Sequence, residues 1–172
     1  MMASRSFRYP AIGCRVLRDN ISYGGTGVVW HRERSMTTRG ISEDALLAQE
    51  ACFARAFADG DPAMARDLYQ PDVVYASPTV RLFDWPAEID GIDRTLEFIA
   101  LTIRGCSAIR YELLEHAVAP GADVAFVRVQ FDWTQSAQRL RSTYVVIYRY
   151  RDGLIARQEL YYDPRGALER LG

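Results

Sequence analysis

The sequence contains no lysine, so all 21 of its basic residues are arginine. They are spread along the chain together with 22 acidic residues, and the formal net charge at pH 7 is -1. Because no stripe of positive charge offers a footprint for a phosphate backbone, we expect no nucleic-acid partner. Arginine in place of lysine fits the codon usage of a GC-rich genome and carries no information about function.

Long apolar runs are also missing. No stretch approaches the roughly 20 apolar residues that a membrane-spanning helix needs, and the N-terminus lacks the apolar run of a secretory signal. The three cysteines, Cys14, Cys52 and Cys106, are an odd number without metal-ligand spacing. We therefore expect a cytoplasmic protein with free thiols, without membrane contact and without a metal or nucleotide cofactor.

Neither helical nor strand periodicity extends over residues 1–40, which we expect to be a poorly ordered extension of a domain at 41–172. Met36 precedes the first strong helical pattern so closely that it is a candidate start of translation. Three glycines cluster at 24–27, but no Lys-Ser/Thr pair follows them, so we expect no phosphate-binding loop. The functional residues are therefore sought in 41–172.

Three helical segments begin the domain, and their predicted bounds are 42–60, 61–69 and 91–105. Ser42 is a suitable N-cap for the first helix, and Gly60 is a suitable stop. At helical spacing, this helix carries Leu46, Leu47, Glu50, Phe53, Ala54 and Phe57. Asp61-Pro62 supplies the N-cap and the first-turn proline of the second helix.

The rest of the domain has the composition of β-structure. Four long segments cover 109–118, 124–134, 140–150 and 154–163. A short segment at 73–77 is a further strand, whereas 81–90 is expected to be an irregular loop. Asp152-Gly153 is a strong hairpin signal between the last two long strands. Helices followed by an antiparallel meander predict an α+β fold.

The segment 124–134 alternates between two kinds of side chain, so its two faces serve different purposes. The odd positions are apolar, whereas Arg128, Gln130 and Asp132 share the other face at intervals of about 7 Å. This polar row is the best site candidate that the residues alone provide. The alternative is that the row faces water, as the polar side of an antiparallel sheet commonly does.

The last two long strands are apolar or amphipathic on both faces, as Tyr144, Val145 and Val146 illustrate. Strands of this kind are covered on both sides. Because one helix layer covers only one face of a small sheet, we expect a second subunit on the other face, in a homodimer.

Several strings resemble the nuclear transport factor 2-like superfamily, which includes SnoaL-like polyketide cyclases, ketosteroid isomerase, scytalone dehydratase and limonene epoxide hydrolase. They are DGD at 59–61, LYQPDVVY at 68–75, Gly91 before the third helix, and YRYRDGLI at 148–155 followed by YYD at 161–163. The resemblance covers roughly Ser42 to Leu171. It implies a cone-shaped curved antiparallel sheet wrapped around three N-terminal helices and enclosing a pocket for a small apolar or aromatic metabolite.

The resemblance to ketosteroid isomerase does not extend to the residues of its mechanism. The isomerase uses an Asp base with a Tyr and a protonated Asp as donors. Here the base position falls on Ser77, the Tyr on Phe53 and the protonated acid near Val146. Steroid isomerisation by that route is therefore not expected.

Limonene epoxide hydrolase resembles this chain more closely. Its pocket arginine matches Arg128 and its water-binding tyrosine matches Tyr75, while its two essential aspartates fall on Gln130 and Leu160. A bound water would thus lack the carboxylate that deprotonates it. The match nevertheless implies that the strand bearing Arg128 faces the cavity, which would place Asp132 in the pocket or at its rim.

We predict a catalytic group in which Asp132 is the base and Arg128 and Tyr75 are its electrostatic partners. The predicted substrate-binding residues are Phe53, Ser77, Trp85, Gln130, Gln158 and Leu160. The first functional hypothesis is a SnoaL-like enzyme that performs cofactor-independent acid/base chemistry, a cyclisation, isomerisation or hydration, on an apolar carbonyl compound. The alternative is a non-catalytic ligand-binding or dimerisation module of the same fold.

Overall fold

The computed structural model describes residues 40–162 and 169–171, and the expected extension at 1–39 lies outside this part of the chain. The elements are α1 (Glu43–Asp59), the 3-10 helix η1 (Pro62–Leu68), β1 (Tyr69–Ala76), the 3-10 helix η2 (Pro78–Phe83), β2 (Glu88–Asp90), α2 (Ile92–Arg104), β3 (Ser107–Val118), β4 (Val124–Gln135), β5 (Gln138–Arg151), β6 (Leu154–Tyr162) and β7 (Glu169–Leu171). The predicted helices and long strands are confirmed. The expected irregular loop at 81–90 instead contains the end of η2 and all of β2.

Local chemistry sets the ends of the first two helices. The Ser42 hydroxyl accepts a hydrogen bond from the backbone N–H of Ala45 at 3.2 Å, and Gly60 ends α1 in the left-handed conformation with φ 69°. The Asp61 carboxylate accepts a hydrogen bond from the N–H of Ala63 at 3.0 Å and so caps η1. These caps hold α1 and η1 at a fixed bend.

The strands form one curved sheet in the order β2-β1-β6-β5-β4-β3, and β7 pairs with β5 outside this path. All strand pairings are antiparallel except that of β1 with β6, which is parallel. The β4–β5 ladder extends to Gln135 opposite Gln138 because Ser136 and Ala137 both adopt positive φ, in a two-residue turn without glycine. This long hairpin carries one wall of the cavity described below.

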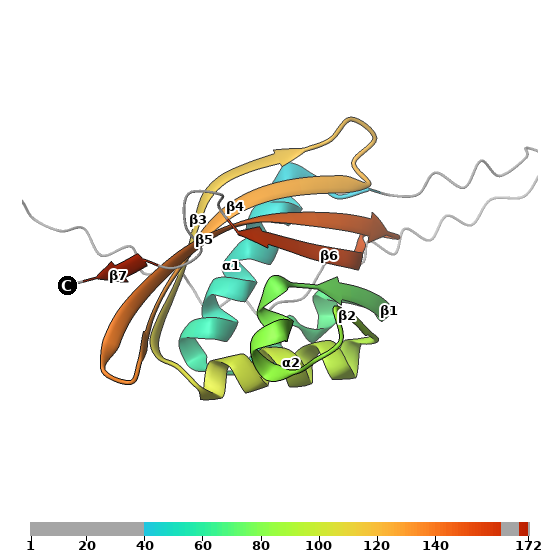
Figure 1. Cartoon of the computed structure of the whole chain (residues 1–172). Coiled ribbons are helices and arrows are strands. Elements are labelled where there is room, and N and C mark those ends of the chain that lie inside the picture. Colours follow the sequence, from blue (N-terminus) through green and yellow to red (C-terminus); the bar gives the residue numbers. More distant parts are fainter. Residues whose placement is uncertain (1–39, 163–168, 172) are drawn as a thin grey trace, which may run out of the picture.

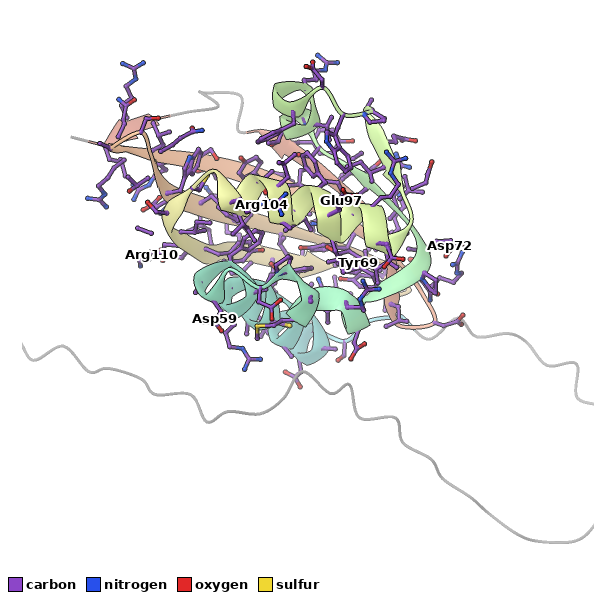
Figure 2. The ribbon with its side chains drawn as sticks, turned by 90° about the horizontal axis from the view of Figure 1, so that it is seen from below. Asp59, Tyr69, Asp72, Glu97, Arg104 and Arg110 are labelled. Carbon is purple, nitrogen blue, oxygen red and sulfur yellow. The ribbon has the colours of Figure 1, made fainter. Side chains whose placement is uncertain are left out.

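The helices pack into the concave side of the sheet (Figure 1). Buried residues of α1 and α2, such as Leu46 and Phe98, share one core with Val127 of β4 and Tyr148 of β5. Seen from below, α2 crosses in front of the sheet, with the exposed residues Glu97 and Arg104 along it (Figure 2). The sheet therefore has an inner face toward the helices and an outer face away from them.

Candidate functional site: a pocket with a buried carboxyl group

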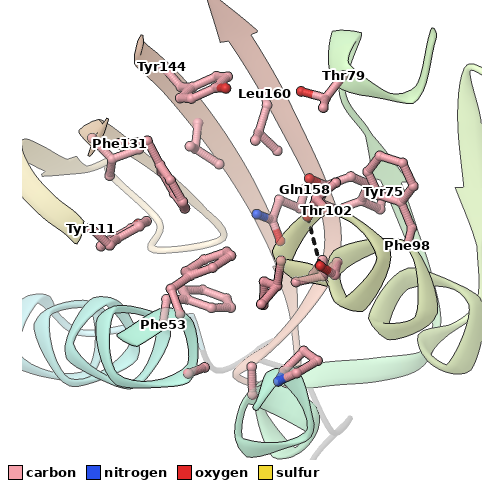
Figure 3. A pocket seen from close by; sticks show the side chains of 18 of the residues that line it. Phe53, Tyr75, Thr79, Phe98, Thr102, Tyr111, Phe131, Tyr144, Gln158 and Leu160 are labelled. Atoms are coloured by element: carbon pink, nitrogen blue, oxygen red, sulfur yellow. Dashed lines mark hydrogen bonds between the residues drawn. The ribbon is translucent and has the colours of Figure 1, made fainter. Parts of the chain in front are cut away.

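A cavity of about 180 Å³ lies between the helices and the inner face of the sheet. Phe53, Tyr111 and Phe131 lie on one side of it, and Tyr75 and Phe98 lie on the other (Figure 3). Ring contacts hold the first side in place, since Phe131 packs edge-on against Phe57 with ring centroids 4.6 Å apart and against Tyr111 at 5.2 Å. The pocket therefore has rigid, largely aromatic walls.

None of the described residues that line this pocket is charged. An ionic ligand would lose its hydration there without gaining a counter-ion, which is costly in an apolar environment. The polar lining groups are hydroxyls, amides and one thiol, that of Cys106. This lining suits a neutral ligand with few polar atoms.

The inner end of the pocket is formed by Tyr69, Tyr111, Tyr148 and Gln158. The Tyr69 hydroxyl donates a hydrogen bond of 2.6 Å to the side-chain oxygen Oε1 of Gln158, and both side chains are buried. At the other end, Gln135 is exposed to solvent. The inner end thus offers polar groups to a ligand that is shielded from water.

Glu50 of α1 lies directly behind this inner end and is only 2% exposed. The Tyr111 hydroxyl donates a short hydrogen bond to its oxygen Oε2, and the Gln49 amide donates one of 3.1 Å to Oε1. The Tyr148 side chain is also buried, and it lies near enough to the carboxyl group to lower its pKa. The elements α1 and β3 therefore meet at one buried acid, and Tyr111 connects it to the pocket wall.

Burial raises the pKa of Glu50 above its usual value, although the hydrogen bonds from Tyr111 and Gln49, the neighbouring Tyr148 and the charge of His116 oppose the shift. Burial likewise raises the pKa values of Tyr111 and Tyr148 well above the usual tyrosine range. Both phenols are therefore neutral hydroxyl groups at physiological pH. The arrangement can exchange a proton with a ligand oxygen, since a titratable acid stands behind hydroxyls that can relay it.

Four of the predicted site residues, Phe53, Tyr75, Gln158 and Leu160, do line the pocket. Two others lie outside the lining, which corrects the prediction. Ser77 is buried as the N-cap of η2, where its hydroxyl accepts a hydrogen bond of 3.3 Å from the N–H of Thr79. Trp85 packs behind the wall, with its ring 5.3 Å from that of Phe98.

The predicted polar row of β4 lies on the outer face of the sheet, so its assignment to the pocket is wrong. Alternate residues of β4, Val129, Phe131 and Trp133, line the cavity, and residues of the other parity point away from it. The predicted alternation of β4 is confirmed, but the face that lines the cavity is the opposite of the predicted one. The apolar residues of β4 line the apolar cavity, and Arg128, Gln130 and Asp132 lie on the other face of the sheet.

Ion pairs occupy two members of this outer row. The Arg141 guanidinium donates two hydrogen bonds to the Asp132 carboxylate, at 2.7 and 2.8 Å, and these hold the pKa of Asp132 below its usual value. Arg128 makes a similar pair with Glu115, at 2.6 and 3.1 Å. A carboxylate paired in this way is a weak base, and Asp132 is also directed away from the ligand space.

Glu50, Tyr111 and Tyr148 are the site residues that sequence reasoning missed. One signal was available, because Glu50 stands among apolar residues on one helical face, where an acid is costly unless it is partnered. No comparable signal marked the tyrosines. Their role depends on the packing of β3 and β5 against α1, and no local sequence pattern predicts this packing.

Among residues 40–162 and 169–171, no group of three or more His, Cys, Asp and Glu side chains could hold a metal ion. No helix in the same ranges is long and apolar enough to cross a membrane.

Several solved structures share this fold. TsrD from Streptomyces laurentii is 20% identical, with a TM-score of 0.60, and the match covers 73% of this chain and 93% of TsrD. SalBIII, an epoxide hydrolase/cyclase-like enzyme in pyran ring formation of the polyether salinomycin, is 10% identical, with a TM-score of 0.60 and coverage of 75% and 95%. An LEH-like epoxide hydrolase from Mycobacterium tuberculosis is 14% identical, with a TM-score of 0.54 and coverage of 70% and 84%. At these identities the likeness shows the fold alone.

No curated protein matches the chain. The SnoaL-like domain, in contrast, matches residues 50–158, which is more than half of the sequence. The matched region runs from the buried acid on α1 to Gln158 at the inner end of the pocket. By this match, the chain belongs to the family of SnoaL-like domains.

Proposed function

We propose that this protein is an enzyme that performs cofactor-independent acid/base chemistry on a small, neutral, apolar carbonyl compound. The observation that carries the proposal is the buried Glu50 carboxyl group, which Tyr111 connects to an apolar pocket. Cyclisation, isomerisation and hydration all begin from a carbonyl group activated at its oxygen. A hydroxyl donor in a water-poor site supplies that activation.

The proposed mechanism assigns the substrate oxygen to the inner end of the pocket. There Tyr111 donates a hydrogen bond to the carbonyl oxygen, and neutral Glu50 replaces the proton that Tyr111 gives up. A raised pKa of Glu50 favours this neutral form. Tyr75, Phe53 and Leu160 serve as walls that orient the apolar part of the substrate.

Hydrogen exchange tests this function without knowledge of the natural substrate. We expect the protein in D2O to speed the exchange of the methyl protons of 2-acetylnaphthalene, followed by NMR, because a hydrogen bond to the carbonyl oxygen makes the methyl C–H bond more acidic, so that solvent D2O removes a proton and returns a deuteron. Glu50→Gln and Tyr111→Phe should each slow this exchange by about 100-fold or more. Asp132→Asn is the matched control, since it alters a carboxyl group outside the pocket and should stay within about twofold of the wild type.

The alternative function is a ligand-binding module without catalysis. It is favoured by one observation, that no carboxylate is among the described residues lining the pocket, so none can remove a proton from a ligand directly. Binding of the ketone without any accelerated exchange would select this alternative. Loss of exchange in Asp132→Asn but not in Glu50→Gln would instead indicate that the active group is the outer row of Arg128, Gln130 and Asp132.

We also propose that the outer face of the sheet forms a homodimer in a reducing compartment such as the cytoplasm. Phe126, Val145 and Tyr161 are exposed apolar residues on β4, β5 and β6, which pair with one another in the sheet. The two described cysteines, Cys52 and Cys106, form no disulfide with each other, which agrees with a reducing compartment. Sedimentation at micromolar concentration tests the dimer, and a monomeric mass would contradict it.

A further inference from the structure

We infer that Glu50 and Tyr111 form a protonation switch that selects the ligand oxygen: a hydroxyl donor when Glu50 is ionised and a carbonyl acceptor when Glu50 is neutral. The inference rests on the proposed function in one respect, since it takes the pocket to bind a small neutral compound. It goes further by naming the class of polar group that the inner end accepts in each state.

The ionised state follows from the hydrogen bonds in the structure. Tyr111 donates to Oε2 of Glu50, and Gln49 donates to Oε1. With Glu50 ionised, the carboxylate can only accept, so the Tyr111 phenol proton points toward it. The Tyr111 oxygen then has only lone pairs to offer the pocket, and these accept a hydrogen bond from a ligand hydroxyl.

The neutral state is constrained by Gln49. The Tyr150 hydroxyl donates a hydrogen bond of 3.2 Å to Oε1 of Gln49, which fixes the amide with its NH2 group toward Glu50. Because that NH2 group already donates to Oε1 of Glu50, the added proton belongs on Oε2, where it points at Tyr111. Tyr111 then accepts this proton's hydrogen bond, and its own hydrogen turns to another acceptor, such as a ligand carbonyl.

The two states are connected by a balanced proton transfer. A ligand O–H bond breaks and its proton passes to the Tyr111 oxygen, while the original Tyr111 proton moves to Oε2 of Glu50. The ligand becomes an oxyanion, Tyr111 stays neutral, and Glu50 becomes a neutral acid. The reverse transfer delivers one proton from Glu50 to an enolate oxygen, so Glu50 acts through Tyr111 as a positioning residue.

The other titratable groups near Glu50 are Tyr69 of β1, His116 of β3 and Tyr150 of β5. The pKa values of both tyrosines are raised, so they stay neutral across the useful pH range. His116, whose Nε2 lies 2.9 Å from Oε1 of Glu43, is the group whose charge stabilises ionised Glu50. Replacing His116 should therefore raise the midpoint of the switch without abolishing it.

Two ligands of matched shape test the inference, 2-naphthol as the hydroxyl donor and 2-acetylnaphthalene as the acceptor. Their dissociation constants are measured by calorimetry from about pH 5 to about pH 8, below the ordinary tyrosine pKa. As the pH rises, we expect the wild type to gain affinity for 2-naphthol and lose affinity for 2-acetylnaphthalene, each by about tenfold. Glu50→Gln, which keeps an oxygen acceptor for Tyr111, should make both profiles flat, and His116→Gln should keep the opposite slopes with a higher midpoint.

Three results would overturn the inference. They are slopes of the same sign for both ligands, opposite slopes that persist in Glu50→Gln, and flat profiles in the wild type. In each of these the pocket still binds, so the proposed function survives. Failure of both ligands to bind at any pH would overturn the switch and the proposed pocket function together, and thermal melting of each variant checks that it is folded.

Discussion

Asp132 and Glu50 lie on opposite sides of the same curved sheet, and their surroundings shift the pKa of a carboxyl group in opposite directions. Asp132 lies on the outer face, where the Arg141 guanidinium holds its pKa below the usual value. Glu50 lies inside, where burial raises its pKa and its partners are neutral. An ion pair keeps an acid charged at neutral pH, whereas a neutral hydrogen-bond network around a buried acid leaves it better able to exchange a proton. The inner acid is therefore the better candidate for chemistry.

The largest expected effect on stability is at the outer acid. Asp132→Asn removes a charge from a nearly buried two-bond pair and should lower the free energy of unfolding by about 2 kcal/mol at pH 7, measured by urea denaturation. Asp132 has a lowered pKa when folded, so its contribution is present above its unfolded pKa of about 3.9 and is lost as the pH falls through the folded value.

A double variant separates the pair from other effects of this substitution. Asp132→Asn combined with Arg141→Gln should cost less than the sum of the two single variants, because each single variant leaves one charge unpaired. Strict additivity would mean that the pair contributes nothing to stability.

A smaller effect with the opposite pH dependence is expected at the inner acid. Because the folded pKa of Glu50 is raised, its contribution to stability is fully present below the unfolded pKa of about 4.3 and is lost as the pH rises through the folded value. Wild-type stability relative to Glu50→Gln should thus decline between acidic and neutral pH. A relative stability that rises over this range would show that the carboxylate is the favoured form.

Local chemistry made much of the fold predictable. Ser42 and Gly60 set the ends of α1, and Asp152-Gly153 forms the expected tight turn, with φ 53° and 78°. The direction of a strand is harder to predict, because alternation shows that β4 has two faces but not which one the helices cover. The inward direction of Gln158 and Leu160 came from the family resemblance, whereas the same resemblance misplaced the row of Asp132.

The candidate site was less predictable than the fold. Glu50 was visible on the helical face of α1, but its partner Tyr111 comes from β3, 61 residues further along the chain, and Tyr150, which holds the neighbouring Gln49, comes from β5, 101 residues from Gln49. Hydrogen bonds across such separations depend on the register of the sheet, which a single sequence does not provide. An acidic residue within an otherwise apolar helical face is therefore the sequence feature that points most directly to such a buried acid.

The smallest expected effect concerns the outer face beyond the ion pairs. Val145→Arg replaces an exposed side chain and should change the free energy of unfolding of one subunit by no more than about 0.5 kcal/mol. If this face forms the proposed homodimer, the same variant should sediment as a monomer. If the wild type and the variant sediment with the same mass, the proposed homodimer through this face is contradicted.

The difference between the two acids can be measured directly by NMR, from the side-chain carboxyl 13C shifts of Glu50 and Asp132 during a pH titration, assigned with Glu50→Gln and Asp132→Asn. We predict that Glu50 titrates above the usual glutamate value of about 4.3 and Asp132 below the usual aspartate value of about 3.9. A Glu50 that titrates at or below its usual value would contradict the account, because the pocket would then hold no acid ready to exchange a proton.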